Sequence, residues 1–253
     1  MKYKIALLGC LLLSPSAWAD TKSDGAEQAL SSSGGIVAPG GPTAVFQNPA
    51  GLTLNSGFAF TGQAGASDSF QQPFLRAGLI GGGASYGLIG GLTQTTSDAK
   101  STSAFYGLGV AASAGLSIGV AGQTGISNAG GTSLNAGILF SGSLPINLGF
   151  TAFGLEDGVQ EWGAGISNKS GPVYFLLDGA YNSRSKHFGL KPGVKVGNPE
   201  AALSLSYGLA DAGSTLQLSE GFTVGGSLKF GSGSIQAYYN DFAKFYLAVT
   251  FML

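Results

Sequence analysis

The chain has 253 residues, a formal net charge of −1, and only 10% charged side chains. A soluble domain usually has about a quarter, so little charged surface is available to face water. Without a clustered basic face, this composition also argues against a nucleic-acid partner.

The first nineteen residues have the pattern of an export signal. Lys2 and Lys4 precede an apolar run at 5–13, and residues 17–19 (Ala-Trp-Ala) form a small-x-small cleavage site. We therefore predict a signal peptide over 1–19. The alternative is a lipoprotein box ending at Cys10. Cleavage after residue 19 would remove Cys10, the one cysteine, and exclude disulfide chemistry from the mature chain.

Residues 20–55 show no sustained alternation and form a segment distinct from the strands that follow. Asn48 can cap a short helical turn, and Pro49 suits the first position of that turn. Gly51 would let the chain leave the turn with a positive φ. The alternative is an ordinary turn before a strand.

From residue 57 onward, strand-like segments recur about every fifteen residues, as antiparallel hairpins would give. The pattern is clearest in 201–209, 222–230 and 245–253, where apolar residues alternate with small or polar ones. The predicted strands are 57–65, 73–81, 84–94, 103–112, 115–124, 132–141, 145–153, 160–167, 172–181, 187–196, 201–209, 221–230, 234–240 and 244–253. The weakest are 57–65, 84–94 and 187–196, so twelve strands is the alternative to fourteen.

Strands with one apolar face, each about ten residues long, are suited to crossing a bilayer at a tilt. Because lipid offers no hydrogen bonds, such strands must close into a ring. The sequence predicts an all-β fold, a transmembrane antiparallel β-barrel over 56–253 in the bacterial outer membrane, surrounded by lipid. Forty-four glycines fit an inner wall lined by small residues.

The last strand is similar to the C-terminal strands of outer-membrane barrels, which carry aromatic residues. Phe245, Tyr246 and Phe251 supply these, although the final residue is Leu253. The barrel-insertion machinery, which reads such strands, is an expected partner.

Residues 44–52 read Ala-Val-Phe-Gln-Asn-Pro-Ala-Gly-Leu, with Phe46, Asn48, Pro49, Ala50 and Gly51 as the motif. This stretch, placed before a barrel, resembles the FadL-type outer-membrane transporters of hydrophobic compounds. PorV-type barrels carry similar stretches. The resemblance implies that residues 20–55 form an N-terminal plug, or hatch, in a fourteen-stranded barrel, through which fatty acids or aromatic hydrocarbons pass and leave sideways. Asn48, Pro49 and Ala50 match position by position, while long external loops are missing from this shorter chain.

Alternation places four basic residues on the inner face: Arg76, Lys191, Lys195 and Lys229. They could bind the carboxylate of a ligand. The alternative is that they pair with Glu161, Asp178 or the plug inside a polar lumen. His187 is the only histidine and lies near a turn, so we expect no metal site, no cofactor and no catalytic triad.

Pro192 interrupts a predicted strand and cannot donate to a ladder. One interpretation is that Pro192 and Gly193 kink the wall and form a side gate. The plainer one is that 187–193 is a loop and the strand begins at Val194.

Together these features predict passive uptake of hydrophobic small molecules, such as long-chain fatty acids, through a plugged lumen. The alternative is an assembly barrel that binds another envelope protein and transports nothing. An outer-membrane lipase or acyltransferase would need a serine partner for His187, and no such motif is recognisable, so we predict that the chain is not an enzyme.

Overall fold

The computed structural model describes residues 35–37, 43–55, 57–67, 72–95, 101–127, 131–141, 145–198, 200–209, 218, 220–241 and 244–253. The predicted signal peptide (1–19) and residues 20–34 and 38–42 of the predicted plug lie outside this set. Among the described residues, no helix is both long and apolar enough to span a membrane.

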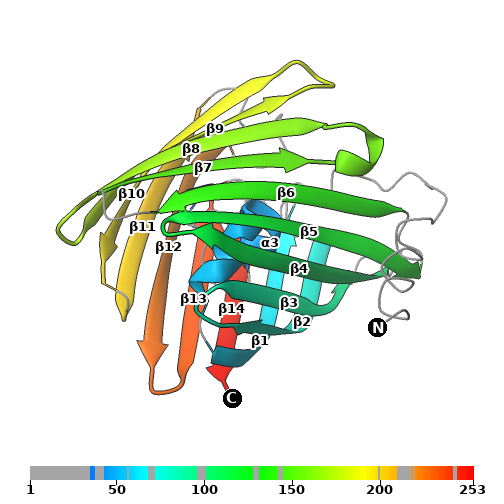
Figure 1. Cartoon of the computed structure of the whole chain (residues 1–253), viewed down its shortest axis with the longest axis horizontal. Helices are drawn as coiled ribbons and strands as arrows, with labels where there is room; N and C mark the ends of the chain where they lie inside the picture. Colours follow the sequence, from blue (N-terminus) through cyan, green and yellow to red (C-terminus); the bar gives the residue numbers. More distant parts are fainter. Residues whose placement is uncertain are drawn as a thin grey trace.

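Fourteen antiparallel strands form one closed barrel, in which each strand pairs with its neighbours in the chain and β1 pairs with β14 (Figure 1). The strands are β1 (Gly57–Ser67), β2 (Gln72–Gly82), β3 (Tyr86–Thr95), β4 (Thr102–Ser113), β5 (Leu116–Ser127), β6 (Thr132–Ser141), β7 (Ile146–Phe153), β8 (Glu161–Ser170), β9 (Val173–Asn182), β10 (Phe188–Gly197), β11 (Ala201–Gly208), β12 (Gly221–Phe230), β13 (Gly233–Asn240) and β14 (Lys244–Met252). The prediction of fourteen strands is confirmed, and the twelve-strand alternative is wrong.

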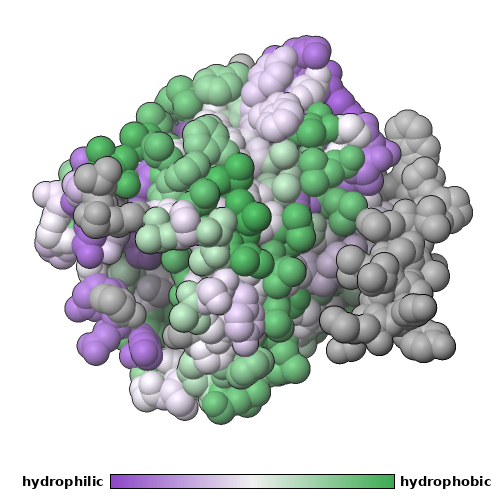
Figure 2. Space-filling model, in the orientation of Figure 1, coloured by the Kyte–Doolittle hydropathy of each residue, from purple (hydrophilic) through white to green (hydrophobic). Residues whose placement is uncertain are grey.

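The two faces of the wall differ as the alternation predicts. On β2, Leu75 and Leu79 are each 54% exposed, whereas Arg76 between them is 4% exposed. Figure 2 shows apolar residues covering the middle of one side of the molecule, with hydrophilic residues toward its margins. An apolar band between polar ends is the outer surface of a barrel embedded in lipid.

The two ends of the barrel have different connections. At the end where the C-terminus lies, the turns between β4 and β5, β8 and β9, and β12 and β13 are tight, and Gly115, Gly171 and Gly231 take positive φ there. At the other end the connections include 154–160, which contains the short helix η3 (Leu155–Asp157), and 209–220. Because outer-membrane barrels have short periplasmic turns and longer outer loops, the end with the C-terminus faces the periplasm.

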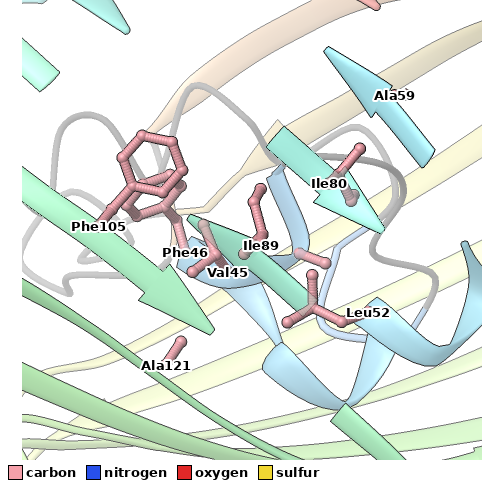
Figure 3. Close-up of a cluster of buried hydrophobic side chains, with 9 residues drawn as sticks. Val45, Phe46, Leu52, Ala59, Ile80, Ile89, Phe105 and Ala121 are labelled. Carbon is pink, nitrogen blue, oxygen red and sulfur yellow. The ribbon is translucent and has the colours of Figure 1, made fainter. Parts of the chain in front are cut away.

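Two short helices lie inside the ring of strands, α3 (Ala44–Gln47) and η2 (Pro49–Leu54) (Figure 1). We call the described residues 35–37 and 43–55 the lumen segment. Its apolar side chains Ala44, Val45, Phe46 and Leu52 form one buried cluster with wall residues Ala59, Ile80, Ile89, Phe105 and Ala121 (Figure 3). The largest apolar core among the described residues is therefore inside the barrel, between this segment and β1–β5.

Candidate functional site

A row of glycines on the inner wall makes room for the lumen segment. Gly87, Gly109, Gly119 and Gly137 are direct cross-strand neighbours on β3, β4, β5 and β6. A Cβ at Gly119 would collide with the backbone of Pro49, and a Cβ at Gly137 would collide with the side chain of Asn48. Only glycine allows the backbone of another segment to approach a strand this closely.

Asn48 joins the lumen segment to the wall and to itself. Its side chain is fully buried, and its Nδ2 donates to the carbonyl oxygens of Ile36 at 2.8 Å and of Ile138, on β6, at 3.1 Å. Its Oδ1 accepts from the amide of Ala50 at 3.1 Å, which caps η2, with Pro49 in the first turn. The predicted cap is confirmed.

The prediction for Gly51 is wrong. Gly51 lies within η2 and does not have a positive φ, because the turn continues as a 3-10 helix to Leu54. Asn55 ends this helix, and its amide donates to the carbonyl oxygen of Leu52 at 3.2 Å.

The start of the lumen segment meets β9. The amide of Ile36 donates to Oδ1 of Asp178 at 3.2 Å. Gly35 has a φ of +59°, and a Cβ there, or on Gly165 of β8, would collide with the Asp178 carboxylate. Asp178 therefore faces inward, as predicted, and holds the lumen segment by a buried hydrogen bond.

Arg76 faces inward as predicted, and its partners include groups on β1–β4 and on the lumen segment. Nε donates to Oγ1 of Thr93 at 2.8 Å, and Nη1 donates to Oε1 of Gln63 at 3.0 Å. The guanidinium carbon lies 3.8 Å from the centre of the Phe46 ring and 5.3 Å from those of Phe74 and Phe105. Such distances allow cation–π attraction.

The three lysines predicted to face inward lie apart from Arg76. Lys191 is 2% exposed, stands in register with Asp178, and its Nζ donates to Oγ1 of Thr223 at 3.3 Å. Lys195 is half-buried opposite Tyr174, and Lys229 is exposed near the turn that ends β12. The structure thus brings Lys191 and Asp178 together on adjacent strands.

Around Pro192 the wall pairs with β9 without a break, but its pairing with β11 is broken. β10 pairs with β9 without interruption from Phe188 to Val196, so the loop interpretation of 187–193 is wrong. With β11, the described register begins only at Gly193 opposite Ser206, although the amide of Leu209 donates to the carbonyl oxygen of Leu190 at 2.9 Å. Because proline has no N–H, the β10–β11 ladder is interrupted at Pro192.

Three buried side chains in the lumen escaped the sequence reasoning. Both amide atoms of Gln47, Nε2 of Gln63 and Oδ1 of Asn135 have no hydrogen-bond partner within the described structure. The alternation places Gln63 and Asn135 inward, but only the cross-strand register shows what lies beside them. An unpaired buried amide is a position where a polar ligand atom or a water could bind.

Two hollows lie on the outer face of the wall. The larger, about 1020 Å³, crosses β4 to β10 and is lined almost entirely by apolar groups, with the small residues Ala136, Ala152 and Ala164 among them. The smaller, about 580 Å³, lies over β1–β4 and β14. Apart from buried residues such as Gln63, Arg76 and Thr151, the residues that line them belong to the lipid-facing surface, so lipid is expected to fill both.

The closed ring and the apolar outer surface define an outer-membrane β-barrel. Neither a protein-family model nor a curated protein sequence matches this chain. Its fold is similar to that of the toluene transporter TodX from Pseudomonas putida, with a TM-score of 0.58, 11% identity, and coverage of 94% of this chain and 97% of TodX.

Two further solved structures share the fold. The monoaromatic hydrocarbon channel CymD has a TM-score of 0.55 and 10% identity, covering 87% of this chain and 94% of CymD. The outer-membrane protein Omp33 of Acinetobacter baumannii has a TM-score of 0.53 and 9% identity, covering 79% of this chain and 100% of Omp33. At these identities the likeness establishes the fold alone.

Proposed function

We propose that the chain is a plugged outer-membrane barrel that lets hydrophobic small molecules cross passively, with the lumen segment as its plug. One observation carries the proposal: the lumen segment meets the inner wall through an apolar cluster that contains Phe46, Leu52 and Phe105. Barrel interiors are ordinarily polar. An apolar patch inside one offers a hydrophobic solute about 0.8 kcal/mol for each methylene that it buries.

Two further features support this function. The Asn48-Pro49-Ala50 motif resembles that of the FadL-type transporters, and the fold is similar to those of a toluene transporter and a hydrocarbon channel. Transport needs no chemical step, so we propose that the protein works by shape and is not an enzyme.

The route within the barrel is also a proposal. Movement of the lumen segment would open a path along the inner wall. The interrupted ladder at Pro192 would then be the weakest part of the wall, and a solute could leave there into the bilayer. For a solute with a carboxylate, such as a long-chain fatty acid, Lys191 beside that ladder would orient the acid group.

Uptake into proteoliposomes tests the function. Vesicles that contain the barrel should accumulate a radiolabelled hydrophobic solute faster than protein-free vesicles, and should take up a sugar of similar size no faster than those vesicles. Equal rates for the hydrophobic solute with and without protein would contradict the proposal.

A second candidate is an assembly barrel whose plug never moves. Two buried hydrogen bonds join the lumen segment to the wall, from Asn48 to Ile138 and from Ile36 to Asp178, and they favour this candidate because they oppose movement. Isolation of a stable envelope partner from the outer membrane, together with the absence of uptake, would support this candidate over transport.

A further inference from the structure

The guanidinium of Arg76 lies in an aromatic cage inside the barrel. Phe46, Phe74 and Phe105 surround the group, with ring centres 3.8, 5.3 and 5.3 Å from its central carbon. Hydrogen bonds to Gln63 and Thr93 hold it in place, and the residue is 4% exposed. Cation–π attraction is strongest when the cation is removed from water in this way.

One side of the cage can be removed without breaking the wall. Phe74 and Phe105 belong to β2 and β4, whereas Phe46 belongs to the lumen segment. Phe46 is the nearest of the three rings to the cation and also packs against Phe105, with ring centres 5.7 Å apart. Another aromatic ring could make the same contact, because the attraction depends on a π face and not on the chain that carries it.

The cage also contains a hydrogen-bond donor, on Gln63, that Phe46 does not contact through a hydrogen bond. Nε2 of Gln63 is a buried donor with no partner among the described groups, although Oε1 of the same amide accepts from Arg76. A buried donor left unpaired is unfavourable, and a phenyl ring carries no oxygen to accept from it. A ring that also carries an acceptor would satisfy both groups.

We propose that the cage of Arg76, Gln63, Phe74 and Phe105 binds an aromatic solute that carries a hydrogen-bond acceptor, and that this ring displaces Phe46 and loosens the lumen segment. The inference rests on the proposed passage of hydrophobic solutes and names the class of solute that opens the path. A saturated ring lacks the π face, and a plain aromatic hydrocarbon lacks the acceptor. Both should therefore open it less well.

Release of the lumen segment can be followed with one thiol. In the full chain with Cys10→Ser, the substitution Gln47→Cys gives a single cysteine in α3. Gln47 is buried and its amide is unpaired, so its replacement removes no hydrogen bond. A water-soluble maleimide should modify this thiol slowly at rest and faster when the segment loosens.

The probes are benzyl alcohol, toluene and cyclohexylmethanol at equal concentrations. Benzyl alcohol should accelerate modification by about tenfold at saturation, the scale of one buried cation–π contact. Toluene, which lacks the acceptor, and cyclohexylmethanol, which lacks the π face, should both act more weakly. Equal acceleration by cyclohexylmethanol would overturn the aromatic assignment, and equal acceleration by toluene would overturn the role of Gln63.

Variants locate the effect. Arg76→Met should abolish the response to benzyl alcohol, and Gln63→Glu, which keeps an oxygen for Arg76 but removes the free donor, should abolish the preference over toluene. Phe153→Leu is the matched control, since it shortens another buried aromatic that makes none of these ring contacts with Arg76. It should leave the response unchanged. Where Arg76→Met does not fold, Arg76→Lys should weaken the response, because it loses the planar face.

Uptake measured with the same variants separates this inference from the proposed function. Uptake that persists without any solute-dependent change in thiol modification would overturn the cage as an opening device while leaving transport intact. Solute-dependent modification without uptake would support the cage and contradict transport.

Discussion

At the residue scale, Asn48 has more buried hydrogen bonds than its neighbours in the motif, and these connect three parts of the chain. Its side-chain amide donates to the carbonyl oxygens of Ile36 and Ile138 and accepts from the backbone amide of Ala50. An aspartate could accept from Ala50 but could not donate to the two carbonyl oxygens, so the motif requires the amide at this position. Pro49 presets the backbone beside it.

Asn48→Ala should therefore destabilise the lumen segment strongly. Removal of the side chain leaves buried backbone groups without partners, at a cost of about 1–3 kcal/mol for each. We expect faster cleavage of the N-terminal region by added protease in the folded, membrane-inserted protein. Asn55→Ala, which removes one bond to Leu52 in the same segment, is the control and should have a much smaller effect.

Gly119→Ala should displace the lumen segment without changing the outer wall. The added methyl group would collide with the backbone at Pro49, which cannot move aside as a flexible side chain would. We expect a less stable lumen segment, measured by hydrogen exchange of the amides in 49–55. Gly62→Ala is the matched control, because a Cβ there meets nothing closer than 4.0 Å. Equal exchange in both variants would contradict the close fit.

At the element scale, local alternation predicts where the strands lie, but it does not predict which residues stand opposite one another on adjacent strands. The period of two placed Arg76, Asp178 and Lys191 on the inner face correctly, because each side chain's direction depends only on its own strand. The glycine row on β3–β6 could not be predicted, because it exists only once four strands are in register. The sequence predicts wrongly where η2 ends, because a glycine at position 51 is typical of a stop, whereas the helix continues to Leu54.

The interrupted ladder between β10 and β11 at Pro192, which we call the β10–β11 seam, belongs to the scale of whole strands. Pro192→Val restores an N–H in line with β11, so the ladder should gain one hydrogen bond, worth about 1 kcal/mol. If solute leaves at this seam, the variant should be more stable in urea titrations and slower in uptake. Pro172→Val, in the tight turn between β8 and β9, is the control and should leave uptake unchanged. Unaltered uptake with Pro192→Val would place the exit elsewhere.

At the scale of the whole molecule, the barrel has an outer surface that contacts lipid and an inner surface that contacts the lumen segment. The outer face presents exposed leucine, isoleucine and phenylalanine side chains to lipid. Part of the inner face is apolar as well, and there the lumen segment covers it. The inner apolar wall is buried while the lumen segment packs against it. Movement of the segment would expose this wall to a solute.

Uptake by a barrel with a reversible lock tests this account most directly. Oγ1 of Thr53 on η2 lies 2.8 Å from Oγ of Ser117 on β5, so Thr53→Cys with Ser117→Cys, in the Cys10→Ser chain, places two thiols within reach of a disulfide. The oxidised protein should take up no hydrophobic solute, and reduction should restore uptake to the rate of the unsubstituted barrel. Equal uptake in the oxidised and reduced states, with the disulfide confirmed by mass spectrometry, would show that the solute does not need the lumen segment to move.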